Sequence, residues 1–199
     1  MKAKKKWHEY LWIASAVYLA LGFINILFAW LGMICFITPL MISIIKGSKS
    51  YCNKYCGRGQ LFELLGNGMG LSRKKASPKF LRSNWFRYGF LTFFMIMFGM
   101  MIFATYLVFS GANSLKEAVT LLWVFRLPWR WVNTSFVTPW VAQFAFGFYG
   151  VMLTSTVLGL ITMAMFKPRS WCVYCPMGTM TQGICKLKDK RGKEATAND

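Results

Sequence analysis

Acidic residues and histidine are scarce in this sequence, and each scarcity excludes a class of function. Only 6 of the 199 residues are Asp or Glu, against 24 Lys or Arg, and His8 is the single histidine. A haem held by two histidines is therefore excluded, and the long apolar runs contain no carboxylate for a proton relay. The sequence also lacks a phosphate-binding loop, a dinucleotide-binding fingerprint and a nucleophile paired with a histidine base.

The first long apolar run covers residues 10–45. As one helix it would be much longer than the hydrocarbon core of a bilayer, which is about 30 Å thick. We interpret it as two helices folded into a hairpin, with a turn between Gly22 and Gly32. The alternative is one long helix kinked at Pro39.

Two further apolar runs, residues 88–109 and 140–166, each predict one membrane span bounded by basic or aromatic residues. The predicted fold class is thus an all-α integral membrane protein with four transmembrane helices, arranged as two pseudo-symmetric hairpins. Each hairpin is followed by a loop with a cysteine pair and by a short helix. We expect one membrane domain with halves at 7–80 and 81–186 and a disordered basic tail at 187–199.

The basic residues predict the orientation, because Lys and Arg are retained on the cytoplasmic side of a membrane. With four spans, only Lys116, Arg126 and Arg130 of the 24 basic residues fall on the other side. We therefore expect a bacterial cytoplasmic membrane protein with both termini and the cysteine motifs in the cytoplasm. The net charge of +18 then reflects topology and attraction to anionic lipid, and not a nucleic-acid site.

The connection between the last two spans has a capping-box pattern at Ser114 and Glu117. This pattern predicts a helix on the outer side of the membrane, ending at Pro128.

Four of the six cysteines occur as close pairs on the predicted cytoplasmic side: Cys52 with Cys56, and Cys172 with Cys175. In a reducing compartment, such pairs are more typical of metal ligands or redox thiols than of structural disulfides. Four thiolates match the ligand count of an iron–sulfur cluster, and we favour [4Fe–4S] over [2Fe–2S]. Cys185 is a candidate additional ligand.

The remaining cysteine, Cys35, lies within an apolar run, and we expect it to be a small core residue.

Residues beside the pairs suit a cluster. Pro176 can open a short helix whose free amides face the sulfurs, and Gly57 and Gly59 allow close approach of the backbone. We expect three cations to offset the thiolate charge, namely Lys54, Arg58 and Arg169. We expect five side chains to cover the cluster from water, namely Tyr51, Tyr55, Trp171, Tyr174 and Met177.

At these residues the chain resembles the NapH/NosR-type family of polytopic membrane iron–sulfur proteins, whose members carry a cytoplasmic Cys-x-x-x-Cys-Pro motif after each of two helix pairs. Here Gly57 replaces the first proline, and only two residues separate Cys172 from Cys175, which precedes Pro176. The resemblance implies electron transfer between a quinol pool or cytoplasmic donor and a partner redox protein.

Many family members continue into a ferredoxin module with closely spaced cysteines, and this sequence has none. We therefore expect separate partners: a ferredoxin or flavoprotein on one side, and an FMN-bearing or other redox subunit across the membrane, with quinone as a further candidate. The chain is expected to be an electron-transfer component of an oxidoreductase complex without a substrate-converting site of its own.

Two other functions fit paired cysteines in a helical membrane protein. One is a thiol–disulfide oxidoreductase similar to the DsbB or vitamin K epoxide reductase enzymes, which keep their cysteines on the oxidising side. The other is a structural subunit with a zinc site. The positive-inside pattern favours the electron-transfer hypothesis over the first alternative.

Overall fold

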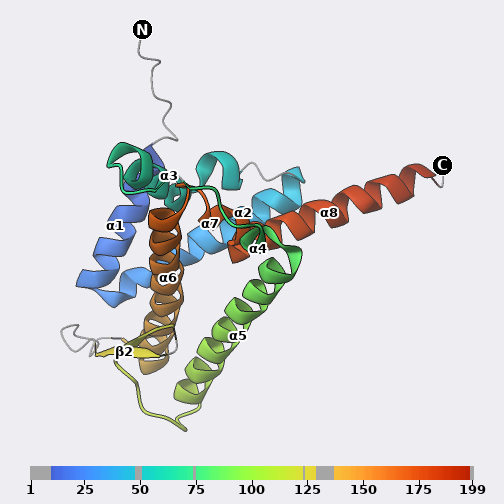
Figure 1. The fold of residues 1–199 in the computed structure, drawn as a ribbon. Coiled ribbons are helices and arrows are strands. Elements are labelled where there is room, and N and C mark those ends of the chain that lie inside the picture. The colour runs from blue at the N-terminus through green and yellow to red at the C-terminus, as the bar shows by residue number, and fades with distance from the viewer. Residues whose placement is uncertain (1–9, 48–50, 74, 123, 129–136, 198–199) are drawn as a thin grey trace.

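A computed structural model describes residues 10–47, 51–73, 75–122, 124–128 and 137–197 (Figure 1). The described chain is mostly helical, with one short antiparallel hairpin. In chain order the elements are α1 (Leu11–Ile24), the 3-10 helix η2 (Ile26–Leu31), α2 (Gly32–Lys46), the π-helical turn η3 (Tyr51–Tyr55), α3 (Gly57–Glu63), the π-helical turn η4 (Leu64–Gly68), α4 (Lys79–Arg82), α5 (Asn84–Phe109), β1 (Ala118–Leu121), β2 (Phe125–Pro128), α6 (Pro139–Met165), α7 (Trp171–Tyr174) and α8 (Pro176–Ala197).

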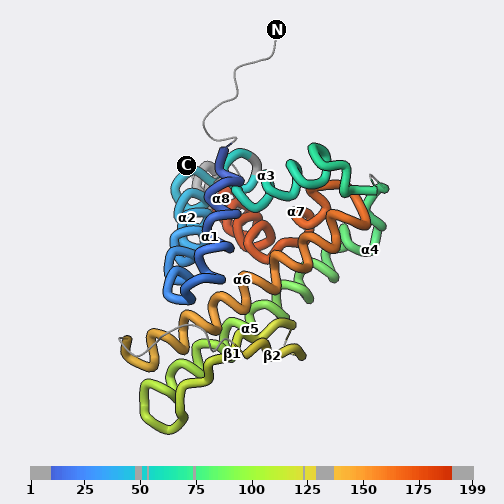
Figure 2. The backbone as a smooth tube through the Cα atoms, turned by 90° about the vertical axis from the view of Figure 1, so that its left-hand side faces the viewer, coloured from blue at the N-terminus to red at the C-terminus, as the bar shows by residue number. Residues whose placement is uncertain are grey.

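The first apolar run is interrupted at Asn25, within the range predicted for a turn. The backbone of Asn25 is extended, and its side-chain oxygen accepts a hydrogen bond of 3.0 Å from the amide of Leu27 at the start of η2. This is a normal N-terminal cap, and it fixes the change of direction between α1 and α2. Pro39 lies inside α2 and does not divide the run. The chain returns along α2 toward the end of the molecule where α1 begins (Figures 1 and 2).

Among the described residues, three helical segments are long and apolar enough to cross a membrane: Ile26–Lys46, Asn84–Phe109 and Pro139–Met165. Helix α1 has 14 residues, which gives it a length of about 21 Å, less than the thickness of a hydrocarbon core. Length and composition therefore support three spans directly, while α1 is a shorter apolar helix beside them.

Helix α6 is the centre of the packing. Its buried residues include Phe146 and Tyr149, which contribute to a core cluster with η2 and β1. Gly22 brings α1 so close to α6 that a Cβ atom built there would lie 2.2 Å from the Tyr149 ring. The Tyr149 hydroxyl donates a hydrogen bond of 2.9 Å to the carbonyl of Leu19. A glycine and a tyrosine therefore hold α1 against α6.

The connection between α5 and α6 corrects the predicted outer helix, because it forms the hairpin of β1 and β2, in which Val119 pairs with Leu127. The reason is tertiary: side chains on α6 accept hydrogen bonds from this segment, Gln143 from the amide of Lys116 and Thr154 from that of Leu122. Val119 is fully buried against α6. Burial of a β-branched residue and these bonds outweigh a local capping preference.

Helix α8 also departs from the sequence expectation, because it continues to Ala197 where a disordered tail was predicted. Lys, Arg, Glu and Ala are strong helix formers, so this segment can extend a helix that is already nucleated. The helix is anchored on the end of α2, where Lys188 donates hydrogen bonds to the carbonyls of Ile44 and Ile45. Buried Ser43 donates a further bond of 3.0 Å to the carbonyl of Thr181.

Candidate metal centre

Short helix α7 positions the second cysteine pair. Trp171 and Tyr174 are buried in an aromatic cluster with Phe90 of α5, at ring-centroid distances of 5.7 Å and 5.1 Å from it. This packing holds α7 beside the cavity described below, which Trp171, Cys172 and Cys175 all line.

The second cysteine of each pair immediately precedes a helix. The Cys56 sulfur accepts a hydrogen bond of 3.4 Å from the amide of Gly59 at the start of α3. The Cys175 sulfur accepts from the amides of Gly178 and Met177 at the start of α8. Both sulfurs thus receive amide donors at the positive end of a helix, which stabilises a thiolate. The glycine three residues after each cysteine, a repeat visible in the sequence, serves the same purpose in both halves.

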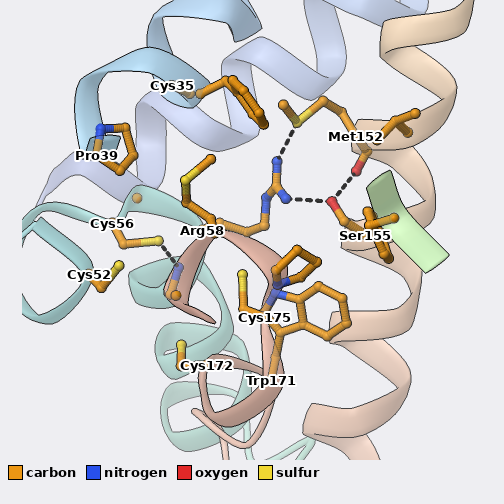
Figure 3. Close-up of a pocket in the computed structure, with 18 of the residues that line it drawn as sticks. Cys35, Pro39, Cys52, Cys56, Arg58, Met152, Ser155, Trp171, Cys172 and Cys175 are labelled. Carbon is orange, nitrogen blue, oxygen red and sulfur yellow. Dashed lines mark hydrogen bonds between the residues drawn. The ribbon is translucent and has the colours of Figure 1, made fainter. Parts of the chain in front are cut away.

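The four paired cysteines line one cavity of about 160 Å³, although they come from two segments more than a hundred residues apart. Figure 3 shows Cys52 and Cys56 on one side of this cavity and Cys172 and Cys175 on another. The cavity continues between the apolar helices, where five aromatic rings line it: Tyr18, Phe36, Phe94, Phe98 and Phe148. The site is therefore a sulfur-lined chamber with an aromatic extension toward the bundle.

Gly59 lies between the two pairs. A Cβ atom built on it would be 3.6 Å from the Cys172 sulfur and 3.7 Å from the Cys56 sulfur. The missing side chain thus leaves open the space between sulfurs of different pairs. Gly57, two residues earlier, has another role, because a Cβ there would lie 2.4 Å from the carbonyl oxygen of Leu11. Gly57 allows α3 to pack on α1, and Gly59 keeps the chamber open.

Burial dominates the acid–base properties of the second pair. Burial, together with a smaller contribution from the nearby Cys56 and Cys175 sulfurs, raises the pKa of the Cys172 thiol to about 12. Burial likewise raises the pKa of Cys175 to about 11, against the opposing effect of its amide donors. These raised pKa values keep both thiols neutral at pH 7, and they would lose their protons on binding a metal.

The three cations that we expected beside the thiolates lie in different surroundings, and only one of them lines the cavity. Arg58 points into the cavity, where its guanidinium donates hydrogen bonds to the Ser155 hydroxyl at 2.5 Å and the Met152 sulfur at 3.1 Å (Figure 3). Arg169 instead pairs with Glu63 at 2.6 Å, and both side chains are nearly half exposed. Lys54 is exposed and does not line the cavity.

The expected cover of the site is present in part. Tyr51, Trp171 and Met177 line the cavity. Tyr174 belongs to the aromatic cluster behind α7, and Tyr55 does not line the cavity.

The two unpaired cysteines lie in different surroundings. Cys35 is exposed and lines the cavity, which corrects its assignment to the core. Cys35 lies on the face of α2 that borders the chamber. An apolar run in a sequence does not show which face of its helix borders a cavity. The Cys185 sulfur lies 3.3 Å from the Ser43 hydroxyl between α2 and α8, and it is not among the residues that line the cavity.

Sequence reasoning missed Met152 and Ser155 of α6, which hold Arg58. The signal that could have found them is the polar stretch Thr154, Ser155 and Thr156 in the middle of an apolar span. Small polar residues at such depth often mark a functional contact.

The chamber suits a cluster better than a single ion. Two sulfurs bound to one zinc lie at most about 4.6 Å apart, since each Zn–S bond is about 2.3 Å. Within the described ranges, no three His, Cys, Asp or Glu side chains gather closely enough for one metal ion. A four-iron core is larger, and its four iron atoms can each take one cysteine sulfur.

Comparison with known proteins points to the same cofactor. Two segments of the chain, residues 28–79 and 149–194, match the family described as 4Fe–4S binding domain. Each matched segment contains one cysteine pair and the helices before and after it. Neither the curated proteins nor the solved structures include a significant match. The chain thus carries the features of an iron–sulfur protein, and its cofactor is a [4Fe–4S] cluster.

Proposed function

We propose that this chain is a membrane electron-transfer subunit, in which Cys52, Cys56, Cys172 and Cys175 hold one [4Fe–4S] cluster. The observation that carries the proposal is the convergence of two cysteine pairs, distant in sequence, on one chamber at the end of a bundle of apolar helices. A [4Fe–4S] cluster supplies a site that accepts and releases one electron without other chemistry. Among the described residues, no histidine or carboxylate lines the chamber, which fits that role.

The surrounding residues have separate tasks in this proposal. The amides at the starts of α3 and α8 stabilise the sulfurs of Cys56 and Cys175. Trp171, which is 2% exposed, and Tyr51 shield the chamber, and exclusion of water protects a cluster from hydrolysis. Because the scaffold is held by aromatic packing and hydrogen bonds to α6 and α2, the ligands need little rearrangement during electron transfer.

We further propose that the protein crosses a bacterial cytoplasmic membrane four times, with α1 as a short first span and the cysteine motifs facing the cytoplasm. Helix α3 packs beside the start of α1, and α8 beside the end of α2, so the motif-bearing elements gather at one end of the bundle (Figure 1). The β1–β2 hairpin lies toward the other end. In the sequence, all basic residues except Lys116, Arg126 and Arg130 fall in segments that this topology assigns to the cytoplasmic side.

The partners that fit this arrangement are those of the NapH/NosR-type proteins that the chain resembles. A cytoplasmic ferredoxin or flavoprotein is the proposed donor, and a redox subunit such as an FMN-bearing protein, or quinone, is the proposed acceptor. The motif end exposes basic side chains that attract an acidic donor and anionic lipid, among them Arg73, Lys75, Lys79 and Arg82.

A redox titration of the loaded protein tests the function. We expect one reversible one-electron step and reduction by an acidic ferredoxin at a rate that falls as ionic strength rises, because salt screens the attraction. A protein that instead cycles its thiols through disulfides, with a two-electron step and no iron signal, would contradict the proposal and support the thiol–disulfide alternative.

Reporter fusions at the C-terminus test the sidedness. Alkaline phosphatase needs disulfides that form in the oxidising periplasm, so a fusion after Asp199 is expected to be inactive. A green fluorescent protein at the same position is expected to fluoresce. Active phosphatase there would place the cysteine motifs on the outer side. That result would contradict the orientation that we infer from the basic residues.

A further inference from the structure

Arg58 is a cation held inside the cysteine-lined cavity by two buried residues of a membrane-spanning helix. Its guanidinium donates to the hydroxyl of Ser155 and to the sulfur of Met152, which are 6% and 8% exposed. Arg58 is also two residues after Cys56, so its backbone belongs to the helix whose first turn faces that sulfur. The side chain thus bridges the cysteine loop and α6 through the cavity.

No carboxylate of the described ranges lies within ion-pair distance of Arg58, and neither of its contacts is charged. The acidic residue of the same short helix, Glu63, is engaged by Arg169 outside the cavity. A half-buried guanidinium without an anionic partner is costly, because neutral acceptors compensate poorly for lost hydration. An anionic group bound in the cavity would compensate the positive charge of Arg58.

From this geometry we propose that Arg58 sets the reduction potential of the cluster, and that Ser155 is the positioning residue that keeps its guanidinium in the cavity. The inference rests on the proposed function and goes beyond it, because it assigns a specific residue to the tuning of the electron carrier. Of the three cations beside the cysteines, Arg58 is the one that lines the cavity and lacks a carboxylate partner.

The sign of the effect follows from charge. Four thiolates give a [4Fe–4S] cluster a net negative charge, and reduction adds one further negative charge. A fixed cation stabilises the reduced form more than the oxidised form, so it raises the potential. The effect is large inside a poorly hydrated cavity and small at an exposed, already neutralised pair.

The test is a potentiometric titration of the detergent-purified, cluster-loaded full chain, followed by electron paramagnetic resonance. Arg58→Gln is expected to lower the midpoint potential, and Arg58→Lys, which keeps the charge, to recover most of the shift. Ser155→Ala keeps the arginine but removes one contact, and it is expected to lower the potential by less than Arg58→Gln. The matched control is the double variant Glu63→Gln and Arg169→Gln, which removes the neighbouring ion pair without changing net charge.

Three outcomes would overturn the inference: an unchanged potential in Arg58→Gln, equal shifts in Arg58→Gln and Arg58→Lys, or a shift in the control as large as that of Arg58→Gln. If Arg58→Gln does not retain its cluster, Ser155→Ala decides, and an unchanged potential in that variant overturns the inference. Failure of the wild-type chain to assemble a [4Fe–4S] cluster is a different result, which contradicts the proposed function itself.

Discussion

Replacement of Cys172 by serine is expected to abolish the visible absorbance and the iron content of the anaerobically purified protein. Cys172 is the cysteine that faces both its own pair and Cys56 across Gly59. A hard hydroxyl oxygen replaces a soft thiolate poorly, so one of the four iron sites loses its ligand. Serine at Cys52, Cys56 or Cys175 is expected to have the same effect, measured by absorption and by iron per chain.

The matched controls are the two unpaired cysteines. Cys185→Ser is expected to leave the absorbance unchanged, because the sulfur contacts Ser43 between α2 and α8 and does not line the cavity. Cys35→Ser is the more demanding control, since this thiol does line the cavity. Retained absorbance in Cys35→Ser supports the proposed ligand set, whereas its loss would show that Cys35 serves as a ligand and that the set is wrong.

A valine at Gly59 is expected to prevent cluster assembly while leaving the fold intact. Its Cβ would sit at ordinary contact distance from the Cys56 and Cys172 sulfurs, and the two methyl groups would fill the space between the pairs. The three atoms nearest to that Cβ belong to cysteine side chains and not to the backbone, so we expect the apoprotein to keep its fold. Iron per chain should fall to background, while the thermal unfolding midpoint of the apoprotein stays close to that of the wild type.

Substitutions at two other glycines serve as controls that distinguish a blocked site from a damaged fold. A Cβ at Gly183 meets nothing within 4 Å, so Gly183→Val should keep both cluster and stability. A Cβ at Gly57 would meet the carbonyl of Leu11, so Gly57→Ala should destabilise the apoprotein, by about 1–3 kcal/mol. Normal iron content in Gly59→Val would contradict the assignment of the chamber as the cluster site.

The sequence predicted well those features that depend on local pattern or residue chemistry. The apolar runs predicted the long helices, and Asn25 interrupts the first run within the range expected for the turn. The sequence also predicted a short helix after each cysteine pair, with Pro176 opening the second, and helices begin at Gly57 and Pro176. The iron–sulfur cofactor followed from the number and type of thiol ligands.

The features that could not be predicted depend on contacts between distant segments. The β1–β2 hairpin forms because Gln143 and Thr154 of α6 accept its amide hydrogen bonds, and a capping-box pattern contains no information about them. The direction of Arg58 likewise depends on Ser155, almost a hundred residues away. Cys35 borders the chamber through the rotation of α2, which packing sets and sequence periodicity does not.

The central claim is that one [4Fe–4S] cluster binds between the two cysteine pairs, and a count of iron and sulfide in the anaerobically purified protein tests it most directly. We predict about four irons and four sulfides per chain, with an electron paramagnetic resonance signal that appears on one-electron reduction. A colourless protein that contains one zinc per chain, or only thiols that interconvert with disulfides, would contradict the account.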